Sequence, residues 1–520
     1  MLRLNPSIDA INRYEEDTGV IRSLFRTGPV DEPIGESLSC ASTSDEFLSV
    51  NSELFDLEGI GLELSEEKEG NAQVTCKYEQ YYKNIPVYGA YLNVTLRKSD
   101  RQVMSAVNRI DYTIREDFAE PIVRLSSGDA LKRMYDRYNP EMQGITHNEP
   151  VLYIYRKQLV WRIEMDSLEP KRYFELMISA VDGDFVGVFD RRRFYTSRPA
   201  KVFWPDPVTS SRNPDLHWGS PEVLLDSELV DVTLDNLDDS AGLLRFLSGK
   251  WVRITELEKP EVILPAAETE FIYSSKDRRF LSVMAYYYLD RLVEWIRLLE
   301  IPAFNDALTD PIDVDAQGVA GEDNSHFVSP VSGPVYLAFG EGGTPDASDP
   351  GVITHEFGHA LHYYLLGKLI PPGSCEEGFN DFFSCVFRDR FNGHGFDRAN
   401  PFPWDNNPTV SWDPSRRCDT ELRFDDPSFD TYGFYRKGTI YATALWDIYL
   451  ETGGKSENSV DRLKAADEIA GIYLDMLIAV GDTGPVMDLV NGLISSDKSR
   501  TGGRCETVIR DAFSRRGLPV

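Results

Sequence analysis

The distribution of apolar residues predicts strands and one helix in the first part of the chain. Residues 72–96 are rich in Tyr, Val, Ile and Thr with partial alternation, and the stretch KNIP lies between two strand-like runs, which indicates a β-hairpin. A short helical stretch at 126–138 precedes further strand-like runs at 151–165 and 172–190, with Asp182-Gly183 as a hairpin turn. The first ~195 residues are therefore expected to form an α+β block.

The pattern changes after this block. Residues 190–215 are basic and then rich in Pro and Ser, which predicts a linker or domain boundary, and residues 220–275 read as strand-like and acidic. Residues 278–300 have apolar positions at helical spacing and predict an amphipathic helix of about 20 residues. Helical patterns dominate from residue 350, including 376–391 and 438–452.

Composition and charge limit the classes of function. A chain of 520 residues is long enough for two to four domains. The net charge of −31 argues against nucleic acid and anionic membranes as partners. No apolar run reaches the length of a membrane span, and the N-terminus lacks the apolar region of a signal peptide. The six cysteines contain no C-x-x-C pair, so up to three disulfides are open and their pairing is undetermined.

One helical segment carries candidate metal chemistry. Residues 354–362 read THEFGHALH; Asp349 can cap this helix, Pro350 suits its first position, and Pro371-Pro372-Gly373 should end it. His355 and His359 are one turn apart, so both imidazoles can reach one zinc ion, and Glu356 beside them could take a proton from zinc-bound water. A chance match of H-E-x-x-H alone is the competing interpretation.

A second helix supplies what such a site lacks. Glu377 and Asp381 in CEEGFNDFF are four residues apart and project from one face. A catalytic zinc needs a third protein ligand, and a ligating histidine needs a carboxylate for its other ring nitrogen. Glu377 fits the first role and Asp381 the second, whereas the alternative is a solvated acidic start of a helix.

H-E-x-x-H followed at this distance by E-G-x-x-D resembles the gluzincin metallopeptidases of the thermolysin and fungalysin families. Residues 323–361 are similar to the edge strand and glycine-rich loop that lead into the active-site helix, and 285–296 to a tyrosine-rich helix of those families. Residues 78–96 resemble the fungalysin/thermolysin propeptide, and the following block is similar to the PepSY module.

The resemblance implies a role for each matching residue. His355, His359 and Glu377 would be the zinc ligands, with Glu376 as the neighbouring candidate for the third. Glu356 would be the general base, and Asp381 would bind a zinc histidine. Asn324 and Ser325 match a pair that binds the substrate backbone, and the strand at 335–339 could then accept an extended peptide as an added strand.

The chain departs from the families at one position. They have a histidine after the third ligand that donates to the tetrahedral intermediate, and this chain has no histidine beyond His394. Alignment places Tyr435 there, with Arg436 adjacent; a phenol can donate to an oxyanion, but Tyr435 could equally be a packing residue.

The expected fold class is α+β: a mixed-sheet prodomain followed by a two-lobed catalytic domain with the zinc site in the cleft between the lobes. The expected boundaries are 1–118 for the propeptide module, 119–195 for the PepSY-like module, 196–360 for the β-rich lobe that ends in the active-site helix, and 361–520 for the helical lobe. Arg191-Arg192-Arg193 is a plausible processing region.

Two functions from different classes follow. The first is a zinc endopeptidase made as a zymogen, whose partners are polypeptide substrates and its own prodomain; the resemblance implies secretion, although an intracellular location stays open without a signal. The second is a non-enzymatic zinc protein that acts as a scaffold or inhibitor with the prodomain docked. An exopeptidase ranks below both, since no pocket for a chain terminus is evident.

Several other features have less specific interpretations. His362, His394 and His326 are expected to be structural rather than functional. The acidic loops 305–323 and 418–430 could hold a structural calcium ion or simply be solvated. FGEGGTPD lacks the ending of a phosphate-binding loop, so that interpretation is set aside.

Overall fold

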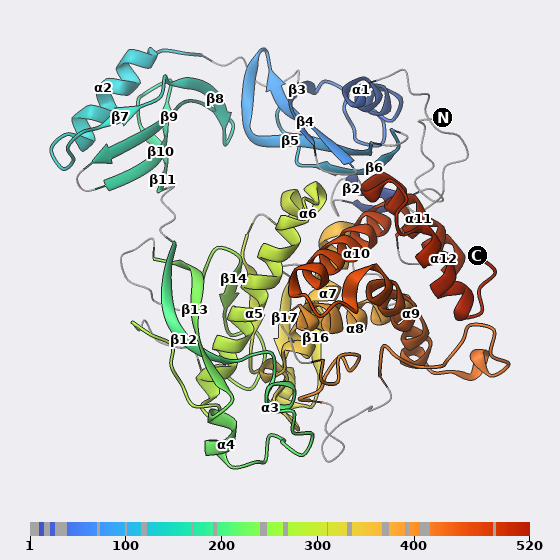
Figure 1. Ribbon diagram of the computed structural model, residues 1–520. Coiled ribbons are helices and arrows are strands. Elements are labelled where there is room, and N and C mark those ends of the chain that lie inside the picture. Colours follow the sequence, from blue (N-terminus) through green and yellow to red (C-terminus); the bar gives the residue numbers. More distant parts are fainter. Residues whose placement is uncertain are drawn as a thin grey trace. The chain divides into compact units, whose positions relative to one another are not determined.

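The chain forms two compact units, one containing Val74–Phe194 and the other Tyr195–Val520. Figure 1 presents this computed structural model. It describes residues 10–14, 21–26, 39–69, 73–98, 101–115, 122–168, 171–190, 195–239, 247–263, 269–308, 310–329, 335–366, 374–390, 395–405, 416–481 and 485–520. Three predictions lie outside the described residues: the processing region at 191–193, the helix end at 371–373 and the structural role of His394.

Mixed α and β structure is confirmed, with a large mixed sheet in the N-terminal unit. Its strands run in the order β1-β2-β6-β5-β8-β9-β10-β11, with β3 beside β4, β4 beside β5, and β7 beside β9. The elements of this unit are β1 (Ala10–Tyr14), β2 (Ile21–Arg26), α1 (Cys40–Val50), β3 (Gly61–Glu69), β4 (Gln73–Tyr82), β5 (Ile85–Arg97), β6 (Val103–Asn108), α2 (Ser127–Tyr138), β7 (Thr146–His147), β8 (Val151–Tyr155), β9 (Gln158–Leu168), β10 (Lys171–Ser179) and β11 (Phe185–Asp190).

The predicted hairpin at 72–96 is confirmed as β4 and β5, which pair through a two-residue turn at Lys83 and Asn84. Both residues have positive φ, 46° and 65°, as this tight turn requires. The run at 151–165 is not one strand, because Arg156 and Lys157 turn with φ of 50° and 63° and separate β8 from β9. No Gly, Asn or Asp marks that turn, so the sequence alone conceals it.

The helix α2 shows how this unit buries its apolar face. Ser126 and Asp129 form a reciprocal capping box that fixes the start of the helix. Its buried side chains pack on the sheet in a cluster of Ala130, Met134, Tyr138, Met142, Ile163, Met165, Leu176 and Ile178. The helix predicted at 126–138 is therefore confirmed.

The second unit begins with a strand where a linker was expected. Residues 195–203 form β12 (Tyr195–Phe203), which pairs antiparallel with β13 (Leu229–Asp238). Over 190–215 a linker or a domain boundary was predicted. The boundary is present, since the two units divide between Phe194 and Tyr195, but residues 195–203 are not a linker, because alternate side chains of β12 pack inward despite the polar composition. Short helices α3 (Pro207–Ser211) and α4 (Glu222–Asp226) follow, so the region 220–275 is only partly strand-like.

A four-stranded sheet in the second unit has the order β14-β15-β17-β16. β14 and β15 run parallel, as do β15 and β17, whereas β16 runs antiparallel to β17. In the sheet as the structure describes it, β14 and β16 are therefore the two edge strands and β17 is interior. The bounds are β14 (Val252–Ile254), β15 (Ile312–Asp315), β16 (Ser325–Val328) and β17 (Tyr336–Phe339).

Helices dominate the rest of the second unit, as the pattern predicts. α5 begins at Arg278 after the cap Asp277, and its aromatic and aliphatic side chains are largely buried. Figure 1 shows α7 among α5, α8 and α10, which also contact it. The helices are α5 (Arg278–Leu298), α6 (Pro302–Ala307), α7 (Pro350–Leu366), α8 (Ser374–Asp389), α9 (Phe434–Tyr449), α10 (Ser459–Val480), α11 (Val486–Thr501) and α12 (Glu506–Arg515), with single turns η1 (Val319–Gly321), η2 (Asp346–Ser348), η3 (Phe429–Thr431) and η4 (Leu450–Gly454).

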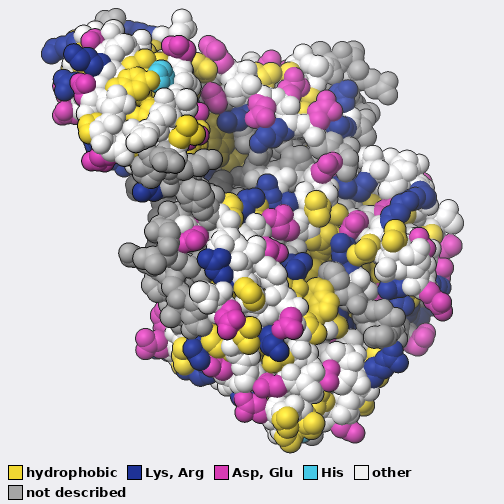
Figure 2. Space-filling model, turned by 60° about the vertical axis from the view of Figure 1, so that its left-hand side comes forward, with side chains coloured by type: hydrophobic (Ala, Val, Ile, Leu, Met, Phe, Trp, Pro, Cys, Tyr) yellow, Lys and Arg dark blue, Asp and Glu magenta, His cyan; other side chains and the backbone are white. Residues whose placement is uncertain are grey.

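On the face drawn in Figure 2, acidic, basic and apolar side chains are interspersed. The large negative charge is therefore not gathered in one acidic patch on that face. Of the helices that the structure describes, none has the length and apolar character needed to cross a membrane.

Candidate metal centre

The helix that carries the H-E-x-x-H sequence is fixed at its first turn. Asp349 accepts a hydrogen bond from the backbone N–H of Gly351 at 2.6 Å, and Pro350 occupies the first helical position, as the sequence predicts. Asp349 also accepts from the Asp405 N–H at 2.7 Å, which ties the segment before residue 406 to the helix start. The metal-binding candidates thus project from a helix whose start is anchored.

Two glycines let the helices approach closely enough to bring the site together. A Cβ atom at Gly358 would lie 2.1 Å from Oδ1 of Asn380, so only glycine lets α8 pack against α7 here. A Cβ atom at Gly378 would lie 2.2 Å from the carbonyl oxygen of Gly438, which holds α9 close to α8. The site therefore rests on three helices in close contact.

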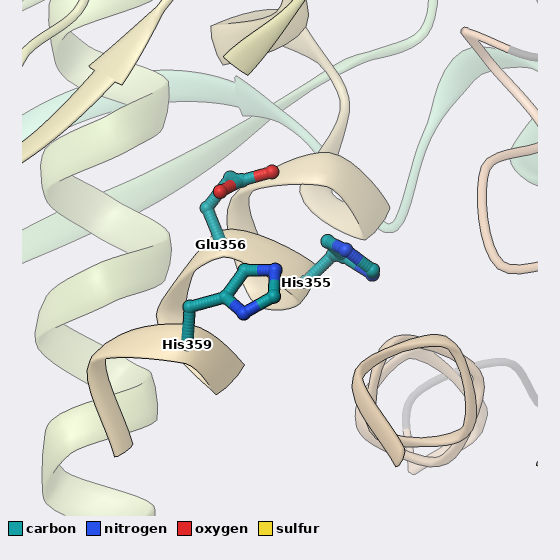
Figure 3. A group of neighbouring side chains, drawn as sticks. All are labelled: His355, Glu356 and His359. Atoms are coloured by element: carbon teal, nitrogen blue, oxygen red, sulfur yellow. The ribbon is translucent and has the colours of Figure 1, made fainter. Parts of the chain in front are cut away.

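The side chains of His355, Glu356 and His359 leave neighbouring positions of α7 (Figure 3). One potential ligand atom from each lies within 4.8 Å of the others, and His355 and Glu356 are buried. Glu377 approaches from α8, with its two carboxylate oxygens 3.2 Å from Nε2 of His355 and 3.5 Å from Nε2 of His359. Two imidazoles of α7 and one carboxylate of α8 therefore face one another.

The two distances, each to a different oxygen of Glu377, can be compared with the spacing of ligand atoms around one zinc ion. Ligand atoms bound at about 2.0–2.1 Å in a tetrahedron are roughly 3.3 Å apart, and the two nitrogen–oxygen distances are close to this value. The donor set of two imidazole nitrogens and one carboxylate is also that of catalytic zinc sites, which keep a fourth position open. His355, His359 and Glu377 are thus the residues that could hold the ion.

The remaining ring nitrogens of the two histidines also face carboxylates. Nδ1 of His355 lies 3.1 Å from Asp381, and Nδ1 of His359 is hydrogen-bonded to Glu376 at 2.7 Å. Such contacts orient an imidazole and fix which nitrogen is left for a metal. Glu376, the alternative third ligand, thus lies behind His359 and not between the two Nε2 atoms.

Arg416 is a buried cation next to this cluster that the sequence reasoning missed. Its guanidinium contacts Asp381 through two nitrogens, at 2.5 and 3.1 Å, and lies 3.4 Å from Glu377. The arginine is 2% exposed, so it offsets part of the charge of the buried carboxylates. Arg416 lies far along the chain from both partners, next to an acidic loop, and carries no motif that could have identified it.

The charges around His355 shape its protonation. Burial favours the neutral ring, but the contacts with Asp381 and Glu377 outweigh it and raise the pKa of His355 to about 9. Burial likewise opposes ionisation of Glu377, yet His355 and the other cations lower the pKa of Glu377 to about 2. Burial lowers the pKa of His359. The carboxylate that would bind a metal is thus ionised throughout the neutral range.

Tyr435 lies at the start of α9, near the cluster. The guanidinium carbon of Arg416 is 4.6 Å from the centre of its ring, and the side chain is 39% exposed. Burial, followed by the negative charge of Glu377, raises the pKa of Tyr435, so the phenol keeps its proton at neutral pH. A protonated phenol this close to Glu377 and Arg416 can donate a hydrogen bond.

The expected substrate strand is wrong in its position. β17, at 336–339, is paired on both sides, whereas β16, which begins at Ser325, is an edge strand among the described residues. Local sequence shows that both segments are extended but does not reveal their neighbours. Asn324 is exposed next to this edge, and the Ser325 hydroxyl donates to Asp346.

His362 and His326 contact groups other than the proposed metal ligands. Ring nitrogens of His362 contact the carbonyl of Gly358 at 2.9 Å and the Tyr473 hydroxyl at 3.2 Å, and His362 is buried. His326 contacts Glu258 at 2.8 Å. These contacts agree with the structural role expected of both residues.

The acidic loops considered for calcium behave differently from each other. Asp323, from the first loop, lies with Asp346 and Asp405, and one carboxylate oxygen of each is within 4.8 Å of the others. In the second loop, Asp419 and Asp425 pair with arginines at 2.8 and 2.7 Å. Calcium in the first group remains a prediction.

Residues 63–104 match the family model of the Fungalysin/Thermolysin Propeptide Motif. That propeptide belongs to secreted proteases, so the N-terminal unit carries a motif of protease zymogens. The match covers a small part of the chain, and the PepSY-like module and the identity of residues 196–520 stay predictions. No curated protein matches the chain. Among solved structures, the Bacillus megaterium YpeB C-terminal domain is similar at 12% identity over 36% of this chain and 87% of that chain, with a TM-score of 0.20, too low to assign a fold.

Proposed function

We propose that the chain is the zymogen of a zinc-dependent endopeptidase of the thermolysin and fungalysin type. The main support is the placement of Glu377, whose carboxylate faces Nε2 of both His355 and His359 at 3.2 and 3.5 Å. The propeptide motif at 63–104 gives independent support, because it belongs to protease precursors. The two features together favour this proposal over a core packing role or a chance match.

The proposed chemistry distributes distinct tasks among residues of the second unit. Zinc held by His355, His359 and Glu377 would polarise the scissile carbonyl and acidify a water molecule. Glu356, beside the two histidines, would accept the proton of that water and pass it to the leaving amine. Tyr435 would donate a hydrogen bond to the developing oxyanion.

The structure suggests how a peptide could be oriented. The edge strand β16 offers a row of backbone groups to an extended peptide, which would add to the sheet as a further strand. Asn324, exposed at the start of this edge, would bind the substrate backbone, and Ser325 would hold the strand in place through Asp346.

The proposed organisation retains the boundaries expected from the sequence. Residues 1–118 and 119–195 would form the prodomain, 196–360 the β-rich lobe, and 361–520 the helical lobe, with the zinc ligands on α7 and α8. The prodomain would act on its own chain as inhibitor and folding aid, and secretion follows from the proposed type of enzyme. Calcium at Asp323, Asp346 and Asp405 would be structural.

Replacing Glu356 by Gln tests the catalytic proposal. The variant should bind as much zinc as the wild type, measured by elemental analysis, while casein hydrolysis falls to background. Glu451→Gln, which alters an exposed carboxylate paired with Lys455, is the matched control and should retain activity. Undiminished casein hydrolysis by Glu356→Gln would overturn the proposed mechanism.

A second candidate is a zinc protein without peptidase activity. The observation in its favour is the missing histidine, because the residue at that position, Tyr435, contacts Arg416 and could be held there by packing alone. Incubation of the full chain with zinc distinguishes the two candidates. Shortening near residue 195 with peptidase activity supports the zymogen, whereas an intact and inactive chain that binds zinc supports the second candidate.

A further inference from the structure

Two cysteines of the second unit lie within contact distance in the interior. Sγ of Cys385 and Sγ of Cys418 are 3.5 Å apart, and both side chains are fully buried. Both are thiols in this structure. Closure to a disulfide bond of about 2.05 Å requires each sulfur to move roughly 0.7 Å toward the other.

The location of this pair connects it with the metal centre. Cys385 follows Asp381 and Glu377 on α8 at intervals of four residues, so the three side chains share one face of the helix. Cys418 follows Arg416 by two residues, and Arg416 contacts both Asp381 and Glu377. The two sulfurs thus join the segment that carries the buried arginine to the helix that carries its partners.

We propose that Cys385 and Cys418 are oxidised to a disulfide that fastens the segment 416–418, and with it Arg416, to α8. The oxidant is an external disulfide such as glutathione disulfide or an oxidised protein dithiol. One thiolate attacks it and forms a mixed disulfide with release of one thiol, and the second thiolate displaces the other half. The two cysteines lose two electrons and two protons, and the external disulfide becomes two thiols.

Because both sulfurs are buried in the folded unit, the disulfide must form before folding is complete. With both sulfurs inaccessible in the folded unit, exchange precedes the packing of residues 416–418 on α8. Once formed, the bond resists reductants until the segment detaches. A cross-link across 33 residues of chain also stabilises the folded unit, since it restricts the unfolded chain.

Peptide mapping of the full chain tests the cross-link independently of zinc or activity. The chain is refolded with glutathione disulfide, alkylated in denaturant without reductant, and digested. The expected product is a peptide pair joining Cys385 and Cys418, two hydrogen masses below the sum of its parts and absent after reduction. Complete alkylation of both residues, or pairing of either with another cysteine, would overturn the proposal.

Unfolding temperature and amide hydrogen exchange test whether the disulfide holds the segment 416–418 against α8. The oxidised wild type should unfold several degrees above the reduced form, and the amides of 416–420 should exchange more slowly. Cys385→Ala/Cys418→Ala should lose the redox dependence, whereas Cys505→Ala, which removes a buried thiol near Glu468, should retain it. Equal unfolding temperatures and equal exchange in the two redox states of the wild type would contradict the fastening, even if the double variant failed to fold.

Discussion

One methyl group added at Gly358 should disturb the packing that brings the two ligand helices together. The new Cβ atom would lie 2.1 Å from Oδ1 and 2.5 Å from Cγ of Asn380, against normal contact distances of about 3.5–4.0 Å. Asn380 is fully buried, so its side chain has no solvent to move into. The clash is therefore relieved only by a change in the buried Asn380 side chain or by a larger separation of α7 from α8.

The magnitude follows from two opposing effects. Overpacking a core costs typically about 1–3 kcal/mol, whereas Gly→Ala inside a helix gains up to about 1 kcal/mol. We expect Gly358→Ala to lower the free energy of unfolding by up to about 2 kcal/mol. In the Asn380→Ala background only the contact with Cβ at 3.2 Å remains, so the same substitution should be neutral or stabilising.

A double-mutant cycle measured by urea unfolding of the full chain with a chelator present isolates this interaction. The expected coupling between Gly358→Ala and Asn380→Ala is about 1–3 kcal/mol. Gly128→Ala is the control, because its Cβ atom would meet only Ser126 Oγ at 3.6 Å, and it should show no coupling to Asn380→Ala. An equal effect of Gly358→Ala in both backgrounds would refute the helix packing described here.

Three further variants test other parts of the structure. Asp381→Asn should weaken zinc binding by about 10–100-fold in competition with a chromogenic chelator, since it removes the carboxylate behind His355; unchanged affinity would argue against this role. Tyr435→Phe should lower kcat by on the order of a hundredfold while the zinc content stays constant, and an unaltered kcat would identify Tyr435 as a packing residue. Burial raises the pKa of Asp290 to about 7, so the folded state binds its proton more tightly than the unfolded state, and stability falls as pH rises from about 4 to 7. Asp290→Asn should remove up to about 4 kcal/mol of this fall in stability. The variant should therefore exceed the wild type in unfolding temperature by more at pH 8 than at pH 5. A difference in unfolding temperature that does not depend on pH would contradict the raised pKa of Asp290.

Features set by short-range sequence were predictable. The start of α7 follows from Asp349 and Pro350, and the four-residue spacing of Glu377 and Asp381 places both on the face of α8 that meets the histidines. Both depend on helix geometry, which neighbouring residues determine. The hairpin at Lys83-Asn84 is predictable for the same reason.

Features that depend on distant contacts were not predictable. Arg416 reaches Asp381 from 35 residues away, and nothing in the neighbouring sequence distinguishes it from Arg417 and Arg423, which follow and are more exposed. The order of the strands was also not predictable, because the composition of 335–339 does not reveal that β15 and β16 flank this segment. The turn at Arg156-Lys157 was missed because it is built without the usual turn residues.

A crystal structure of the zinc-loaded chain, with anomalous scattering recorded on both sides of the zinc absorption edge, tests the central claim most directly. The account predicts one strong zinc peak at about 2.0–2.1 Å from Nε2 of His355, Nε2 of His359 and a carboxylate oxygen of Glu377, with the Glu356 carboxylate nearby. A zinc-loaded crystal with no peak among these three side chains, or with Glu377 turned away from the ion, would contradict it.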